Sequence, residues 1–115
     1  MILAVVGSRT FTNYELFKAE LDHYRNITRI ISGGAKGADV MARRYAKEND
    51  ITIREYIPNW SQYGKNAGYK RNVFIIDDAE QLLAFWDGSS KGTRHSIDLA
   101  YKRGIPVRII DTKRS

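Results

Sequence analysis

The chain has 115 residues, the size of one domain with a single hydrophobic core, and its net charge of +6 indicates an anionic partner. Without cysteine it has neither disulfides nor thiolate catalysis, and its two histidines, His23 and His95, are too far apart in sequence for a zinc motif. The sequence shows no signal peptide and no apolar run that could span a bilayer, so we expect a cytoplasmic protein without a metal or cofactor.

The first half of the chain predicts three strands in alternation with two helices. A continuous apolar run at residues 2–6 is typical of a strand buried on both faces, and an apolar helical repeat follows it. The run at 29–32 predicts a second strand, with a glycine-rich turn and a helix over about 38–49 behind it. Residues 51–57 alternate β-branched and polar side chains, which predicts a third strand near an edge.

The second half begins with a long polar segment, 58–72, that is rich in aromatic residues. Loops of this length within a domain are usually functional, and the aromatic residues argue against disorder. A helix is predicted to start in the second half of this segment and to end near residue 77. Residues 81–86 predict a fourth, buried strand, and 106–110 predict a fifth after a helix that stops at Gly104.

Side chains that can cap helices mark two of the predicted helix starts. Thr12 and Glu15 have the spacing of a capping box for the first helix. Thr93 is placed to cap the last helix.

Alternating strands and helices predict a Rossmann-like three-layer α/β/α fold. We expect residues 1–115 to form one domain around a five-stranded parallel sheet with strand order 3-2-1-4-5. In such folds ligands bind beyond the carboxyl ends of the strands, where the strand order reverses. The unusual segments of this chain all follow predicted strands, so we expect them to meet at one edge of the sheet.

The turn Gly33-Gly34-Ala35-Lys36-Gly37 is the most informative segment. Glycines allow the backbone to approach a ligand closely, and the amides and dipole of the next helix favour an anion there. The turn matches neither the dinucleotide G-x-G-x-x-G pattern nor the P-loop pattern. The alternative is a plain strand-to-helix turn whose glycines only relieve strain.

Basic residues gather in the four loops that follow predicted strands. These loops, 8–13, 33–39, 58–72 and 87–95, contain two acids, Asp39 and Asp87. Their bases are Arg9, Lys36, Lys65, Lys70, Arg71, Lys91 and Arg94. Basic residues concentrated at one edge of the sheet fit a multiply charged anion better than a generally basic surface would.

Each candidate side chain has a less specific alternative. Arg9 could hold a phosphate or form a surface salt bridge, and Lys36 and Lys91 are as easily solvated loop residues. Trp60 and Tyr63 could stack on a base, fill a small loop core or make a subunit contact.

The acids and hydroxyls of these loops also have alternatives. Asp39 could cap its helix or bind a ribose hydroxyl, whereas Asp87, at the end of a buried strand, is the better candidate for a base or ribose contact. Ser8, His95 and Asp98 lack the motif expected of a catalytic triad. The predicted ligand-binding residues are Gly7, Ser8, Arg9, Ser32, Gly33, Gly34, Lys36, Gly37, Asp39, Lys65, Arg71, Asn72, Asp87, Ser90, Lys91, Gly92 and Thr93.

The chain has four motifs in order: Val5-Val6-Gly7-Ser8-Arg9, Ser32-Gly33-Gly34-x-x-Gly37-Ala38-Asp39, Gly64-Lys65-x-Ala67-Gly68-x-x-Arg71-Asn72 and Asp87-Gly88-x-Ser90-x-Gly92-Thr93. They resemble those of the SLOG superfamily, which contains the LOG cytokinin-activating enzymes and DprA, and most closely its small YspA-like branch of bacteria and phages. The resemblance implies a nucleotide-derived ligand between the first loop, the glycine turn and the Gly92-Thr93 turn. LOG enzymes have a catalytic glutamate in Gly-Thr-x-x-Glu, where this chain has Ser96.

The resemblance therefore favours a binding protein over an enzyme. An ADP-ribose or cyclic-ADP-ribose type of signal, sensed or sequestered in conflict between phages and bacteria, is the ligand that it implies. One alternative is a LOG-like hydrolase of nucleoside monophosphates with Asp87 or Asp98 as a displaced acid, where Arg71 would supply charge stabilisation. A second alternative is a DprA-like nucleic-acid binder. We also expect a homo-oligomer, because the aromatic loop could complete the pocket across an interface.

Overall fold

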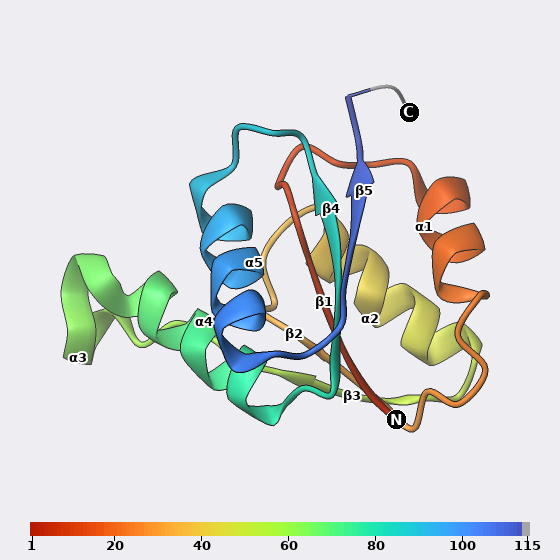
Figure 1. The fold of residues 1–115 in the computed structure, drawn as a ribbon, viewed down its shortest axis with the longest axis horizontal. Coiled ribbons are helices and arrows are strands. Elements are labelled where there is room, and N and C mark those ends of the chain that lie inside the picture. Colours follow the sequence, from red (N-terminus) through yellow and green to blue (C-terminus); the bar gives the residue numbers. More distant parts are fainter. Residues whose placement is uncertain (114–115) are drawn as a thin grey trace.

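The computed structural model, which describes residues 1–113, contains the predicted five-stranded parallel sheet (Figure 1). Its strands lie in the order β3-β2-β1-β4-β5, which confirms the predicted order. The chain passes outward from β1 to β3 and then returns to place β4 against the other side of β1. The strand bounds are Ile2–Gly7, Arg29–Ser32, Thr52–Glu55, Gln81–Trp86 and Val107–Asp111 for β1 to β5.

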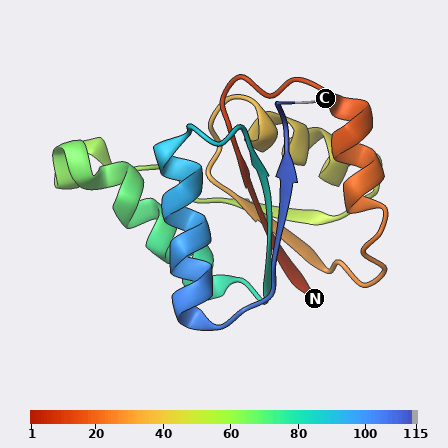
Figure 2. The ribbon, with the colours of Figure 1, turned by 45° about the horizontal axis from the view of Figure 1, so that its top comes forward.

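Helices cover both faces of the sheet, which gives the expected three layers. Figure 1 shows α1 (Tyr14–Leu21) and α2 (Ala38–Glu48) on one face, and α4 (Ala67–Asp78) and α5 (Lys91–Arg103) on the other. The helix predicted to start in the second half of the 58–72 segment is confirmed by α4. The first half, predicted as a loop, is also mostly helical: it contains α3 (Trp60–Tyr63) and the 3-10 turn η1 (Gly64–Asn66), which project away from the sheet ahead of α4 (Figures 1 and 2).

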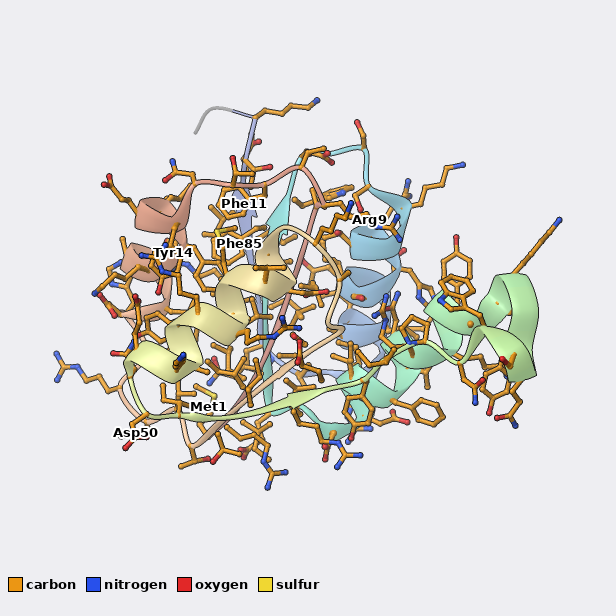
Figure 3. All side chains as sticks on the ribbon, turned by 180° about the vertical axis from the view of Figure 1, so that it is seen from behind. Met1, Arg9, Phe11, Tyr14, Asp50 and Phe85 are labelled. Atoms are coloured by element: carbon orange, nitrogen blue, oxygen red, sulfur yellow. The ribbon has the colours of Figure 1, made fainter. Side chains whose placement is uncertain are left out.

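The apolar runs of the central strands supply two separate hydrophobic cores. Successive side chains of a strand point to opposite faces, so Leu3 and Val5 pack towards α1 and α2 while Ala4 and Val6 pack towards α4 and α5. In the first core the ring centroids of Phe11 and Phe85 lie 5.0 Å apart, and Figure 3 shows these two side chains together. A strand with helices on both sides has no polar face, which explains why its sequence is continuously apolar.

Two helices begin differently from the sequence prediction. Asn13, and not Thr12, caps α1: its Oδ1 accepts a hydrogen bond from the Leu16 amide at 3.1 Å. Ser90 caps α5, with its Oγ accepting from the Thr93 amide at 3.4 Å, so Thr93 lies inside the first turn. The predicted end of α5 is confirmed, because Gly104 has the left-handed φ of 78° that suits a C-cap. None of the helices within residues 1–113 has the length and apolar character needed to cross a membrane.

Candidate functional site

A cleft of about 350 Å³ lies beyond the carboxyl ends of β1 and β4, where the strand order reverses. The loop after β1, the glycine turn, α4 and the start of α5 all contribute to its wall. The lining residues include Gly7, Ser8, Arg9, Thr10, Gly33, Ala35, Asp39, Arg71, Asn72, Asp87, Ser90, Gly92, Thr93 and Ser96. We call this space the first cavity.

A second cavity of about 430 Å³ adjoins it on the side of α3. The two share six lining residues, so they form one continuous cleft: Arg9, Gly33, Ala35, Arg71, Asn72 and Gly92. The residues that only the second cavity has are largely apolar or aromatic: Gly34, Ile57, Pro58, Trp60, Lys65, Gly68 and Tyr69.

Most of the predicted site residues line one cavity or the other, but Ser32, Lys36, Gly37 and Lys91 do not. Lys36 and Lys91 are exposed. Ser32 is fully buried at the end of β2, and among the described residues its Oγ has no hydrogen-bond partner. These four positions therefore differ from the rest of the predicted set, which the fold brings together.

Gly37 has a packing role that follows from its backbone. Its φ is 74°, and a Cβ there would lie 2.9 Å from the carbonyl carbon of Arg9 and would overlap the Ser8 carbonyl oxygen. Glycine at this position therefore lets the glycine turn approach the loop after β1. The two loops together form one side of the first cavity.

Asp39 changes the expected chemistry of the glycine turn. Its side chain is buried, and its Oδ2 accepts a hydrogen bond from the Ala35 amide at 3.0 Å. Burial raises the pKa of Asp39, while the amides of Ala35 and Gly33 and the nearby Arg71 act in the opposite direction. The turn was predicted to offer free amides to an anionic ligand, but a carboxylate of the chain itself uses part of that capacity.

Arg71 lies at the wall that the two cavities share. Its Nη1 donates to the Gly33 carbonyl at 2.7 Å and to the Tyr56 carbonyl at 3.4 Å, and its Nε donates to Asn72 Oδ1 at 3.0 Å. Burial lowers the pKa of Arg71, although Asp39 raises it. Among residues 1–113 neither Arg71 nor the exposed Arg9 forms an ion pair with a carboxylate. Both guanidinium groups line the cleft without such a partner.

Asp87 organises the loop between β4 and α5. Its Oδ1 accepts hydrogen bonds from the amides of Ser89 and Ser90, each at 2.8 Å. These amides, the Ser89 amide most strongly, lower the pKa of Asp87. The carboxylate lines the first cavity, but one of its oxygens is used to shape the loop. Asp87 therefore has a structural role in this loop, and its contact with a base or ribose stays a prediction.

Hydroxyl groups gather where α5 begins. Ser90 Oγ and Thr93 Oγ1 lie 3.0 Å apart, and both residues line the first cavity. Ser96, one turn later, also lines the cavity and donates a hydrogen bond to the Gly92 carbonyl at 3.3 Å. Figure 3 shows Arg9 beside this end of α5. The cleft therefore offers hydroxyls, helix amides and a guanidinium at one place, which is a suitable environment for a phosphate.

His95 and Asp98, which lack the sequence motif of a catalytic triad with Ser8, contact other residues. An Asp98 carboxylate oxygen lies 3.9 Å from Arg94 Nε in an ion pair, and His95 Nδ1 lies 3.2 Å from Asn72 Nδ2. The group of basic residues at the edge of the sheet is smaller than predicted, since only Arg9, Lys65 and Arg71 of the loop cations line the cleft. Within the described part of the chain, no three histidine, aspartate or glutamate side chains gather as they would around a metal ion.

Sequence reasoning missed several residues of the cleft. Thr10 and Ala35 are sequence neighbours of predicted site residues, so their positions in the loops could have indicated that they line the cleft. Ser96 follows Thr93 by almost one helical turn and was noticed only through the LOG resemblance. Ile57 and Gly68 line the second cavity, and nothing local in their sequence marks them.

Two comparisons with known proteins identify relatives of this chain. The sequence model described as "YspA, cpYpsA-related SLOG family" matches residues 1–63, which contribute the first loop and the glycine turn. The chain is also similar to the gene 61 protein of Mycobacterium phage D29. The two are 39% identical over 84 residues, which cover 68% of this chain and 67% of the phage protein.

Proposed function

The chain belongs to the YspA, cpYpsA-related SLOG family, and from this premise we propose that it binds a phosphate-bearing small molecule derived from a nucleotide. An ADP-ribose or cyclic-ADP-ribose type of signal is the ligand that we favour. The protein would act as its sensor or sequestering partner in conflict between phages and bacteria, and the similarity to a phage protein supports that setting.

The observation that carries this proposal is the state of Arg71. A partly buried guanidinium has lost part of its hydration, and here neutral oxygens replace it instead of a carboxylate. Arg9, at the same cleft, also lacks a carboxylate among the described residues. An anionic ligand would supply the direct ion pair that both side chains lack, since Asp39 acts on Arg71 only electrostatically. Guanidinium groups also match the geometry of phosphate oxygens.

Titration calorimetry with ADP-ribose, cyclic ADP-ribose and nucleoside monophosphates tests the proposal. Arg9→Gln removes a charge without breaking an ion pair, so the folded protein should be preserved while the dissociation constant rises by about ten-fold or more. Arg25→Gln is the control. Arg25 is exposed in the chain segment between α1 and β2 and lines neither cavity, so this substitution removes one charge away from the cleft. Absence of heat with every one of these compounds would count against the proposal.

One observation favours a second function, hydrolysis of the N-glycosidic bond of a nucleoside monophosphate. The carboxyl group of Asp39 lines the first cavity and has a raised pKa, as a general acid requires. As the N-glycosidic bond breaks, Asp39 would protonate the departing base, water would form the new bond to the anomeric carbon, and the remaining proton of that water would return to Asp39. Asp87 and Asp98 are poorer acids for this step, because the pKa of Asp87 is lowered and Asp98 does not line the cleft.

Incubation with AMP and chromatography for free adenine test the hydrolase. We expect the released adenine to disappear in Asp39→Asn if the acid acts as described, whereas Asp98→Asn should have no effect. No adenine from the unmodified protein would exclude this second function and leave the binding function intact.

A further inference from the structure

The two cavities differ in the kind of group that each can hold. The first cavity is lined by hydroxyl groups and by the backbone of two segments, the glycine turn and the start of α5. The second has two aromatic rings, Ile57 and Pro58 in its wall, with Lys65 as its own cation. Arg71 belongs to both walls. A ligand with a charged end and a flat apolar end would match this division.

The position of Trp60 is unusual for so large an apolar side chain. It is the first residue of α3, on the projecting part of the molecule, and 57% of it is exposed. The backbone around it is fixed on both sides, because Asn59 Oδ1 accepts from the Gln62 amide at 3.1 Å and α4 follows within a few residues. The exposed indole is therefore held at the mouth of the second cavity and not on a free tail.

Gly68 lies beside this ring. It lies in the first turn of α4, where glycine is unfavourable for a helix. A Cβ on Gly68 would have one neighbour within 4 Å, the Cη2 atom of Trp60 at 4.0 Å. Tyr69, the next residue, rests edge-on against His95 with ring centroids 4.7 Å apart, so its ring is also fixed at the cavity.

We propose that the second cavity is a subsite for the nucleobase, which stacks on Trp60 beside Gly68 while the phosphate occupies the first cavity and Arg71 lies between them. This subsite rests on the proposed binding function. Tryptophan and tyrosine rings bind bases through stacking, which tolerates different bases because each presents a π face. The proposal names the class of ligand: a phosphorylated nucleoside and not a phosphorylated sugar alone.

The test compares two probes that share a phosphate and differ in the base. AMP and ribose 5-phosphate are titrated into the unmodified protein and into Trp60→Ala. We expect the variant to bind AMP at least about ten-fold more weakly and ribose 5-phosphate unchanged. Tyr101→Ala is the control, because Tyr101 is 61% exposed on α5 and lines neither cavity.

A second variant keeps Trp60 and adds a methyl group beside its ring, at the wall of the second cavity. Gly68→Ala fits the helix, so its thermal stability should equal or exceed that of the unmodified protein. We expect this variant to bind AMP several-fold more weakly and to bind ribose 5-phosphate with unchanged affinity. Loss of AMP binding in a protein of full stability cannot be attributed to unfolding.

The outcomes separate the subsite from the function on which it rests. Equal effects of Trp60→Ala on both probes, or no effect on either, would overturn the subsite while the binding function stands. A change in sedimentation of Trp60→Ala with unchanged affinities would likewise overturn it, because Trp60 would then be a subunit contact. Failure of the unmodified protein to bind AMP, ribose 5-phosphate and ADP-ribose would overturn the function and the subsite together.

Discussion

The buried Asp39 should make the stability of the protein depend on pH. Because burial raises its pKa in the folded state, the folded protein holds the Asp39 proton more tightly than the unfolded chain does. This contribution to stability is fully present below the unfolded pKa and is lost as the pH rises through the folded pKa. Each unit of difference between the two pKa values corresponds to about 1.4 kcal/mol.

Asp39→Asn tests this directly, because the amide can still accept the Ala35 hydrogen bond but cannot ionise. Urea unfolding of both proteins from pH 3 to pH 7 should show the stability of the variant, relative to the unmodified protein, increasing as the pH rises. A difference that does not change with pH would show that Asp39 has no unusual pKa.

Gly33 is required by the position of Arg71. A Cβ on Gly33 would lie 2.7 Å from Arg71 Cζ and would overlap Nη1. Gly33→Ala should therefore displace the guanidinium, and we expect it to weaken the binding of ADP-ribose by about as much as Arg71→Gln does. Thermal unfolding of Gly33→Ala is the stability control, because it shows whether the fold is kept while the guanidinium moves. Full affinity in Gly33→Ala would show that Arg71 does not act on the ligand from its present position.

Helix starts are where the sequence prediction was least accurate. Thr12 and Glu15 have the spacing of a capping box, yet α1 begins one residue later, with Asn13 as its cap. Thr93 was expected to cap α5, but Ser90, three residues earlier, does so. Several residues that can cap lie next to each other in these loops, and the sequence alone does not say which one adopts the non-helical backbone.

Neighbouring substitutions measure which residue caps α1. Asn13→Ala should lower the free energy of unfolding by about 1 kcal/mol, because the Leu16 amide loses its acceptor. Thr12→Ala, one residue away, should be close to neutral. Denaturant unfolding of the two variants gives the answer, and equal losses would contradict the assignment.

The elements themselves were more predictable than their ends. Apolar runs, the glycine turns and the stop at Gly104 were enough to predict the sheet order and the layers, because right-handed parallel connections leave few alternatives. The 58–72 segment was predicted only in part. A four-residue helix followed by a 3-10 turn has too few residues to show a helical period, so α3 and η1 had no local signal.

Charge shows the limits of sequence reasoning for the molecule as a whole. The loops carry most of the net positive charge, but the fold directs only Arg9, Lys65 and Arg71 into the cleft. Arg94 pairs with Asp98, and Lys70 lies 5.7 Å from the Tyr63 ring centroid. Such pairings depend on side chains from other turns and elements, and a count of loop residues cannot predict them.

The small number of cations in the cleft predicts a modest salt dependence. With two or three charged contacts, affinity for ADP-ribose should fall by no more than about ten-fold to thirty-fold between 50 and 200 mM salt. The affinity of a DprA-like nucleic-acid binder for an oligonucleotide would fall by about a thousand-fold or more over the same range, because such a protein neutralises many phosphates. Titrations at both salt concentrations distinguish these cases.

The carboxylate of Asp39 on the glycine turn has a consequence for selectivity. The side-chain oxygens of Asp39 accept hydrogen bonds at that end of the first cavity, and a bare diphosphate or polyphosphate has few hydrogens to donate to them. A sugar with free hydroxyls can donate to the same oxygens and is attracted. The protein should therefore reject inorganic polyanions of the cell in favour of compounds that present a diol to Asp39 and their phosphate to Arg9 and Thr93.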